Sequence, residues 1–268
     1  MSPAMQVTGK IMKYELRDVA RSRWLFAYTA FFLLATDALL RFSDGGGRAL
    51  LSLMNVVLII IPLVTVVFAT MYLYNAREFT EVLLAQPVGR RQLFVGLYLG
   101  LTLPLSAGFA AGVTLPFVYQ GGLDDPALRA TLTALLVTGV ALTAVFTALA
   151  YLIATRTDDR VKGLGIAIAG WLAASVLYDG LVLFLALRFA DYPVERPLLG
   201  LMLANPVDLA RIVLLLQFDV SALMGYTGAV FKHFFGSAGG IAIAATALLL
   251  WIALPVYGGL RAFERKDF

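Results

Sequence analysis

The 268-residue chain contains no cysteine and a single histidine, His233. The absence of cysteine excludes disulfide bonds, thiolate catalysis, Cys-type zinc sites and iron–sulfur clusters. A single imidazole likewise leaves no cluster of histidines that could hold a metal. Copper would have to bind methionines such as Met54, Met202 and Met224, but methionine is also common as packing material in apolar cores. The sequence therefore predicts no metal site and no cofactor held by this chain itself.

Charged residues are also scarce, forming 14% of the chain against about 25% in typical soluble proteins. Hydrophobic residues form 60% of the chain. Such a chain is too hydrophobic to be disordered and has too little polar sequence to cover a soluble domain. The net charge of +4 is too small to indicate binding to nucleic acid. The composition favours an integral membrane protein, built as a single domain over residues 1–268.

Instead of charges, the sequence has long apolar stretches. Because a helix needs about 20 mostly apolar residues to cross a bilayer, six stretches qualify as transmembrane helices. They are residues 24–40, 49–76, 92–123, 130–155, 163–187 and 233–260. The first is too long and too aromatic for a signal-peptide core. The alternating pattern of a β-barrel is absent, so we expect an all-α membrane fold.

Lysine and arginine predict the orientation of these spans. With a cytoplasmic N-terminus, the cytoplasmic segments would hold 14 of the 21 Lys and Arg residues, and the outer segments 7. Because cytoplasmic loops carry the excess of these residues, we expect both termini in the cytoplasm. The third outer loop, residues 188–237, is long yet apolar. This predicts a re-entrant segment that dips into the outer membrane face, or packs on the bundle, before the sixth span.

Ahead of the first span, residues 11–24 predict a basic amphipathic helix. Lys13, Arg17 and Arg21 recur every four residues and so share one helix face. The residues on the apolar face are Met12, Leu16, Val19 and Ala20. Such a helix lies at the membrane surface with its apolar side in the lipid. A positive flank that only determines topology would show the same residues.

The loop between the second and third spans, residues 76–92, is the most specific segment. Phe79, Val82 and Leu83 follow i, i+3, i+4 spacing and predict an apolar stripe on a short helix. Glu78 and Glu81 fall in its first turns, where the helix dipole favours acids. The residues that end the helix and return the chain to the membrane are Pro87, Gly89, Arg90 and Arg91. An ordinary amphipathic loop helix would share these features.

This loop resembles the cytoplasmic coupling helix of ABC-2-type permeases, the membrane subunits of one class of ATP-binding-cassette transporter. The residues that match the family pattern are Glu78, Thr80, Glu81, Leu83, Leu84, Pro87, Arg90 and Arg91. Phe79 departs from it, because the family usually has glycine there. The six-span layout resembles the family as well.

The resemblance implies a permease in the bacterial inner membrane that docks a separate cytoplasmic ATPase through residues 78–91. No phosphate-binding Gly-x-x-x-x-Gly-Lys-Ser/Thr loop occurs in the chain, so ATP and Mg would bind to the partner, and the chain itself would not be an enzyme. The resemblance also implies a second permease copy, as a homodimer.

A segment of the third outer loop predicts a helix start. Asn205 suits the N-cap, Pro206 the first helical position and Asp208 the first turn. Together with Arg211 and the run from Asp219 to Gly225, the segment resembles the NosY branch of these permeases. That branch serves assembly of the copper sites of nitrous-oxide reductase. It implies a periplasmic NosD-like partner, in contact with Asn205, Pro206, Asp208 and Arg211, and copper handled by partner proteins.

Two acids fall inside predicted spans, where charges are costly and usually functional. Asp37 is one helix turn from Arg41, so we expect it to pair there or to reach water near the outer end. Asp179 has Arg188 as its nearest cation in the sequence. It pairs with another helix, lines a cavity or lies near the outer surface.

Other functions have less support in the sequence. Within the family, export of a lipid, a drug or haem is the alternative to copper-site assembly. An autonomous secondary transporter needs convergent polar groups and usually an inverted repeat, and the sequence shows two isolated acids and no repeat. An intramembrane enzyme would lack nearly all catalytic residue types. A structural anchor for periplasmic machinery would keep its function without ATPase activity.

Overall fold

The computed structural model describes residues 3–43, 45–86, 88–120, 123–189, 195–217 and 238–266, and over these residues it contains helices and no strand. The helices are α1 (Pro3–Arg21), α2 (Arg23–Phe42), α3 (Gly46–Asn75), α4 (Arg77–Leu84), α5 (Arg90–Tyr119), α6 (Pro126–Arg156), α7 (Arg160–Leu172), the π-helix η1 (Ala173–Leu177), α8 (Tyr178–Arg188), α9 (Glu195–Leu203), α10 (Pro206–Gln217) and α12 (Ala238–Arg265). Six of the helical segments are long and apolar enough to cross a membrane: α2, α3, α5, α6, Arg160–Arg188 and Gly239–Arg265. The prediction of an all-helical fold with six candidate membrane spans is confirmed, and counting the bent α9–α10 pair as one span would give seven.

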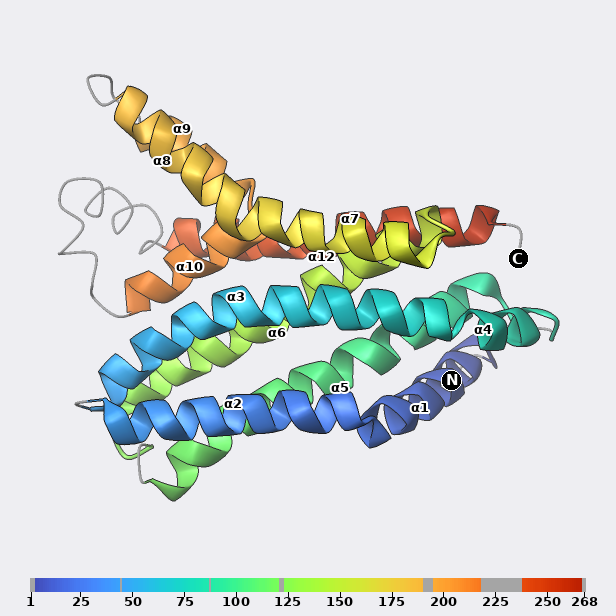
Figure 1. Cartoon of the computed structure of the whole chain (residues 1–268), viewed down its shortest axis with the longest axis horizontal. Coiled ribbons are helices and arrows are strands. Elements are labelled where there is room, and N and C mark those ends of the chain that lie inside the picture. Colours follow the sequence, from blue (N-terminus) through green and yellow to red (C-terminus); the bar gives the residue numbers. More distant parts are fainter. Residues whose placement is uncertain are drawn as a thin grey trace.

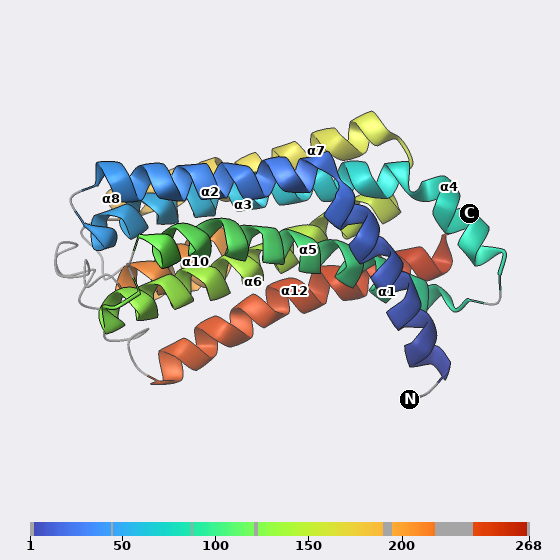
Figure 2. The ribbon, with the colours of Figure 1, turned by 90° about the horizontal axis from the view of Figure 1, so that it is seen from below.

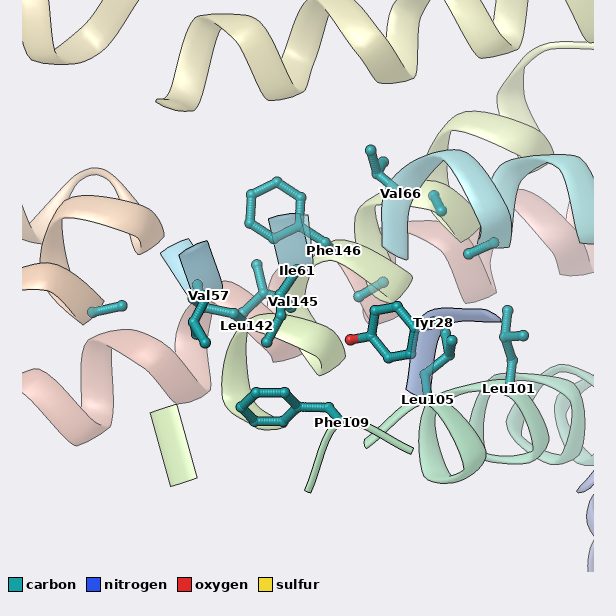
Figure 3. Close-up of a cluster of buried hydrophobic side chains, with 14 of the residues drawn as sticks. Tyr28, Val57, Ile61, Val66, Leu101, Leu105, Phe109, Leu142, Val145 and Phe146 are labelled. Carbon is teal, nitrogen blue, oxygen red and sulfur yellow. The ribbon is translucent and has the colours of Figure 1, made fainter. Parts of the chain in front are cut away.

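The long helices run side by side, with α5 packed against α1, α2, α6 and α12, and with α6 packed against α3, α5, α10 and α12 (Figures 1 and 2). In α5, 72% of the most apolar stretch is buried, against 6% in Arg160–Arg188. Figure 3 shows apolar side chains from α2, α3, α5 and α6 meeting in the core around Phe109 and Phe146. Phe32 of α2 lies edge-on to Phe109, with ring centroids 5.1 Å apart. α3, α5 and α6 therefore form the rigid centre, and the other spans form the periphery.

Both chain ends and α4 lie at the same end of the bundle (Figures 1 and 2). An even number of spans brings the two termini to one side, as the predicted topology requires. The α9–α10 pair bends by 109° between Pro197–Leu203 and Pro206–Leu216, a geometry shared by broken spans and re-entrant loops. Residues 190–194 and 218–237 of the predicted re-entrant loop lie outside the described residues.

The amphipathic helix differs in two ways from the prediction for residues 11–24. It is longer toward the N-terminus and ends at Arg21, because Ser22 caps α2 by accepting a hydrogen bond from the Trp24 amide at 3.3 Å. Leu16, on the apolar side predicted to face lipid, is 37% exposed, whereas Val19 of the same predicted side is buried within the chain. The buried residues are Ile11, Glu15 and Val19. The basic residues Lys13, Arg17 and Arg21 are exposed, as the prediction has them.

Two glycines of α5 explain this choice of face. Gly96 and Gly100 have the spacing that permits close helix contact. A Cβ added at Gly100 would lie 2.4 Å from Cβ of Glu15, and one at Gly96 would lie 2.8 Å from Cγ2 of Ile11. Glu15 is buried at this contact and accepts a hydrogen bond from the Tyr72 hydroxyl of α3, while burial raises the pKa of its carboxyl.

We expect Gly100→Val to force α1 away from α5, because the new Cβ meets Glu15 at a distance that no real contact shows. Overpacking of this kind costs about 1–3 kcal/mol of unfolding free energy. Thermal unfolding in detergent would report the loss, and limited proteolysis would report release of α1. Gly165→Val is the matched control, since nothing lies within 4 Å of a Cβ at Gly165. Equal melting temperatures for the two variants would contradict the α1–α5 contact.

Candidate functional site

The helix α4 has one side on the bundle and one side open. Thr80 is 6% exposed and donates a hydrogen bond to the Ala76 carbonyl at 2.9 Å, so its side chain completes the first turn. Glu78 and Val82 are exposed on α4, and Val82 is 62% exposed. The helix ends at Leu84, ahead of Pro87, which lies outside the described residues.

Part of the predicted apolar stripe is used within the chain. Phe79 stacks on Tyr14 of α1, with ring centroids 5.2 Å apart and the planes at 20°. Leu83 and Leu84 pack against the hydrophobic core. Of the stripe formed by Phe79, Val82 and Leu83, Val82 is therefore the member open to a partner. The bulky Phe79, where the family usually has glycine, ties α4 to α1.

Ion pairs connect α4 to two other parts of the chain. Arg77 pairs with Glu81 at 3.3 Å and with Asp158 at 3.4 Å. Asp158 lies between α6 and α7, and it also pairs at 2.8 Å with Lys266, which follows α12. The hydrogen bond from Lys266 lowers the pKa of the Asp158 carboxyl, so it is ionised at neutral pH. Asp158 thus joins α4 to the end of α12.

The first residue of α5 strengthens the same junction. Arg90 donates hydrogen bonds from Nη1 to the carbonyls of Glu264 and Lys266, at 2.7 and 2.8 Å. These carbonyls are among those that the end of a helix leaves without partners. Arg90 is therefore engaged within the chain, whereas Arg91 beside it is exposed. The sequence did not reveal Asp158 and Lys266, because they are far apart along the chain.

A second polar cluster lies where α8 meets α10. Arg211 of α10 contacts Asp179 of α8 at 2.8 Å and Asp208, one turn earlier on α10, at 3.0 Å. The Asp208 side chain is 7% exposed, against 37% for Asp179 and 30% for Arg211. Arg211 thus offsets two carboxylates at the edge of the apolar bundle, where an unpaired charge would be costly.

Asn205 connects this cluster to the π-helix. Its side-chain oxygen accepts a hydrogen bond from the Val207 amide at 3.0 Å, which is the predicted N-cap of α10. Its side-chain nitrogen donates to the Ala174 carbonyl of η1 at 2.7 Å. A π-helix disturbs the regular helical hydrogen bonding and is frequent at functional sites. The bend between α9 and α10 is thus attached directly to the irregular turn of the fifth span.

The α9 end of the bend is also held by side chains. The Tyr178 hydroxyl of α8 donates to the Leu201 carbonyl at 2.7 Å. The indole N–H of Trp251 in α12 donates to the Leu203 carbonyl at 3.3 Å. The last carbonyls of α9 therefore find partners on two other helices, and α8, α9, α10 and α12 are connected around the cluster.

The structure brings together residues that the sequence suggested separately. Asp179 pairs with another helix, one of the three predicted possibilities, and its partner is Arg211 rather than Arg188. Asp208, Arg211 and Asn205 belong to the same cluster, while Pro206 begins α10 beside it.

Asp37 lies apart from this cluster. Its carboxylate pairs with Arg41 at 2.8 Å, the predicted partner. It also accepts hydrogen bonds from the Tyr119 hydroxyl and from the side-chain amide nitrogen of Gln120, at 2.6 and 2.8 Å. Asp37 therefore joins the end of α2 to the end of α5.

These features define a multi-pass helical membrane protein with one polar junction around a short loop helix and another around a bent helix pair. The profile of the ABC-2 family of transporter proteins matches residues 46–268, and the chain belongs to this family. It is similar to the "Probable ABC transporter permease protein NosY" of Pseudomonas aeruginosa, with 26% identity over 95% of this chain and 94% of that protein. The protein of the same name from Stutzerimonas stutzeri is 24% identical over 96% of this chain and 95% of its own. The predicted resemblance is confirmed: the chain is an ABC transporter permease subunit.

We expect Arg211→Met to destabilise the fold, because it leaves Asp179 and Asp208 without their cation. Breaking a buried pair costs roughly 3–5 kcal/mol of unfolding free energy, and about 2–3 kcal/mol is expected here because Arg211 is partly exposed. Thermal unfolding in detergent measures the change.

Arg188→Met is the matched control, since it removes a cation from the end of α8 without touching the cluster. Adding Asp179→Asn and Asp208→Asn to Arg211→Met should recover most of the lost stability. A triple variant as unstable as Arg211→Met would show that the loss does not come from uncompensated carboxylates.

Proposed function

We propose that this permease subunit docks a separate cytoplasmic ATPase on the open side of α4 and converts its ATP-driven movement into work at the opposite membrane face. The position of Val82 and Glu78 is the observation that carries the proposal. An exposed apolar side chain beside an acid on a short helix fits a groove of a partner protein, and the charge orients the contact. Arg91, near the start of α5, is also exposed.

The opposite side of α4 offers a route for the movement. Arg77 of α4 forms an ion pair with Asp158, which also pairs with Lys266 after α12. Phe79 of α4 stacks on Tyr14 of α1, and α1 packs on α5. A displacement of α4 would therefore reach α1, the α6–α7 connection and α12 together. A rigid, docked element of this kind is what a subunit without its own ATPase site requires.

The charge distribution supports a cytoplasmic position for this end. The end that carries α4 and both termini corresponds to the segments that hold 14 of the 21 Lys and Arg residues. Cytoplasmic loops carry such an excess. In this orientation the protein lies in the bacterial inner membrane, with the ATPase, its ATP and its Mg in the cytoplasm.

At the outer face, the bent α9–α10 pair would act on a periplasmic NosD-like partner. Asn205, Pro206, Asp208 and Arg211 are proposed to position this pair for the contact, as in the NosY branch that the sequence resembles. The work done would serve assembly of the copper sites of nitrous-oxide reductase. Copper would be held by partner proteins, because the chain has no cysteine, and Met54 is buried in α3. Met224 and His233 lie outside the described residues.

A second copy of the chain would complete the permease. The peripheral span Arg160–Arg188 presents exposed apolar side chains, including Leu183 and Phe184, which suit either lipid or a neighbouring subunit. A homodimer would place any substrate path between the two copies. An ABC-2 exporter of a lipid, a drug or haem would share the ATPase contact. The presence or absence of a periplasmic partner therefore distinguishes copper-site assembly from export.

The test is co-purification from native membranes with wild-type protein and Val82→Asp. A buried carboxylate in an apolar contact is costly, so we expect the ATPase to be lost from the Val82→Asp eluate. Val82→Leu should retain it. Val161→Asp is the matched control, because Val161 is an 80% exposed valine at the start of α7. Quantitative mass spectrometry of the eluates measures the ratio of ATPase to permease.

If Val82→Asp retained the ATPase at the wild-type ratio, the result would contradict the proposal that α4 is the docking element. A periplasmic NosD-like protein in the wild-type eluate would support copper-site assembly. Its absence, with the ATPase present, would favour the exporter alternative.

A further inference from the structure

A cleft of about 650 Å³ opens between α2 and α3, beside the junction of α1 and α2. Neither polar cluster uses it. Leu105 of α5 lines it as well, and its apolar lining on α2 and α3 includes Leu25, Tyr28, Leu63, Val64, Val67 and Phe68. A mostly apolar cleft of this size, with a few polar groups, has the character of a small-molecule site.

The polar groups gather at one end of the cleft. Asp18, Arg21 and Ser22 line it at the α1–α2 junction, and Asn75 lines it at the last turn of α3. From Asn75 the cleft follows α3 to Leu63, about 18 Å along the helix at 1.5 Å per residue. Half of a bilayer core of about 30 Å is close to that length. The shape therefore suits an acyl chain that crosses one leaflet, with its headgroup at the α1 end.

The charges at this end are of both signs. Asp18 and Arg21 are exposed, lie three residues apart on α1, and form no ion pair within the described parts of the chain. One oxygen of Asp18 lies 3.1 Å from the Tyr72 hydroxyl, which leaves its other oxygen available. A headgroup that carries both a phosphate and an ammonium would satisfy both residues.

We propose that the cleft binds one phospholipid with a phosphoethanolamine headgroup. The phosphate contacts Arg21, whose guanidinium can hold two phosphate oxygens at once. The primary ammonium donates hydrogen bonds to Asp18 and to the side-chain oxygen of Asn75. A choline headgroup has no N–H to donate, and a glycerol headgroup brings no cation to Asp18. This site does not depend on the ATPase contact proposed for α4.

The test uses the full-length permease, washed free of lipid in detergent and supplied with dioleoyl lipids that differ only in the headgroup. Native mass spectrometry and thermal shift titrations measure binding of phosphatidylethanolamine, phosphatidylcholine and phosphatidylglycerol. We expect one phosphatidylethanolamine per chain, bound about tenfold more tightly than the other two, as one charge-assisted contact would give. Equal affinity for the three headgroups would overturn the proposal.

Variants assign the contacts. Arg21→Gln and Asp18→Asn should each lower the affinity for phosphatidylethanolamine about tenfold. Val64→Trp, which fills the cleft, should abolish binding of all three lipids. Lys13→Gln is the matched control, a cation on the same helix that does not line the cleft. A loss with Lys13→Gln equal to that with Arg21→Gln would show a general electrostatic effect and contradict the site.

Discussion

A charge inside a lipid bilayer is costly unless it is paired, and the ion pairs among the spans of this permease follow from that cost. Arg211 lies between Asp179 and Asp208, so one guanidinium holds two carboxyl groups at the edge of an apolar bundle. The same constraint attaches the α9–α10 bend to the fifth span, because Asn205 bonds to the π-helix carbonyl of Ala174. The fifth span and the α9–α10 pair, whose contacting residues are far apart in the sequence, are thereby held together.

Charged residues are also paired at the other end of the bundle, around α4, but these pairs are more exposed to solvent. Asp158 is 75% exposed, so its pairs with Arg77 and Lys266 contribute little to stability individually. What they provide is a defined position for α4 relative to α12. Arg90 adds to this by donating hydrogen bonds to the carbonyls of Glu264 in α12 and of Lys266 just after it. The junction is therefore specific in geometry and modest in energy, which suits the movement that we propose for α4.

Between these two junctions lies a packed centre of α3, α5 and α6, and the less buried spans surround it. Close-packed protein cores transmit displacement as discrete shifts of whole elements. In this ABC-2 permease subunit, the arrangement places α4, which we propose as the docking surface, and the bent α9–α10 pair on helices that share contacts with α12. A helix such as α4, with one side packed on its own chain and the other side exposed, can contact a partner and the core of the bundle at the same time.

The sequence by itself determined the six spans, the loop helix α4 and the N-cap at Asn205. Each depends on residues that are neighbours in the chain: charge-free length, i to i+4 spacing and capping side chains. The tertiary structure alone decided which charges pair, as when Asp179 finds Arg211 instead of Arg188. It also decided that Glu15 faces α5, since the glycines that admit it belong to another helix. These pairings and contacts depend on which helices become neighbours in the folded chain, and local sequence patterns do not predict which helices become neighbours.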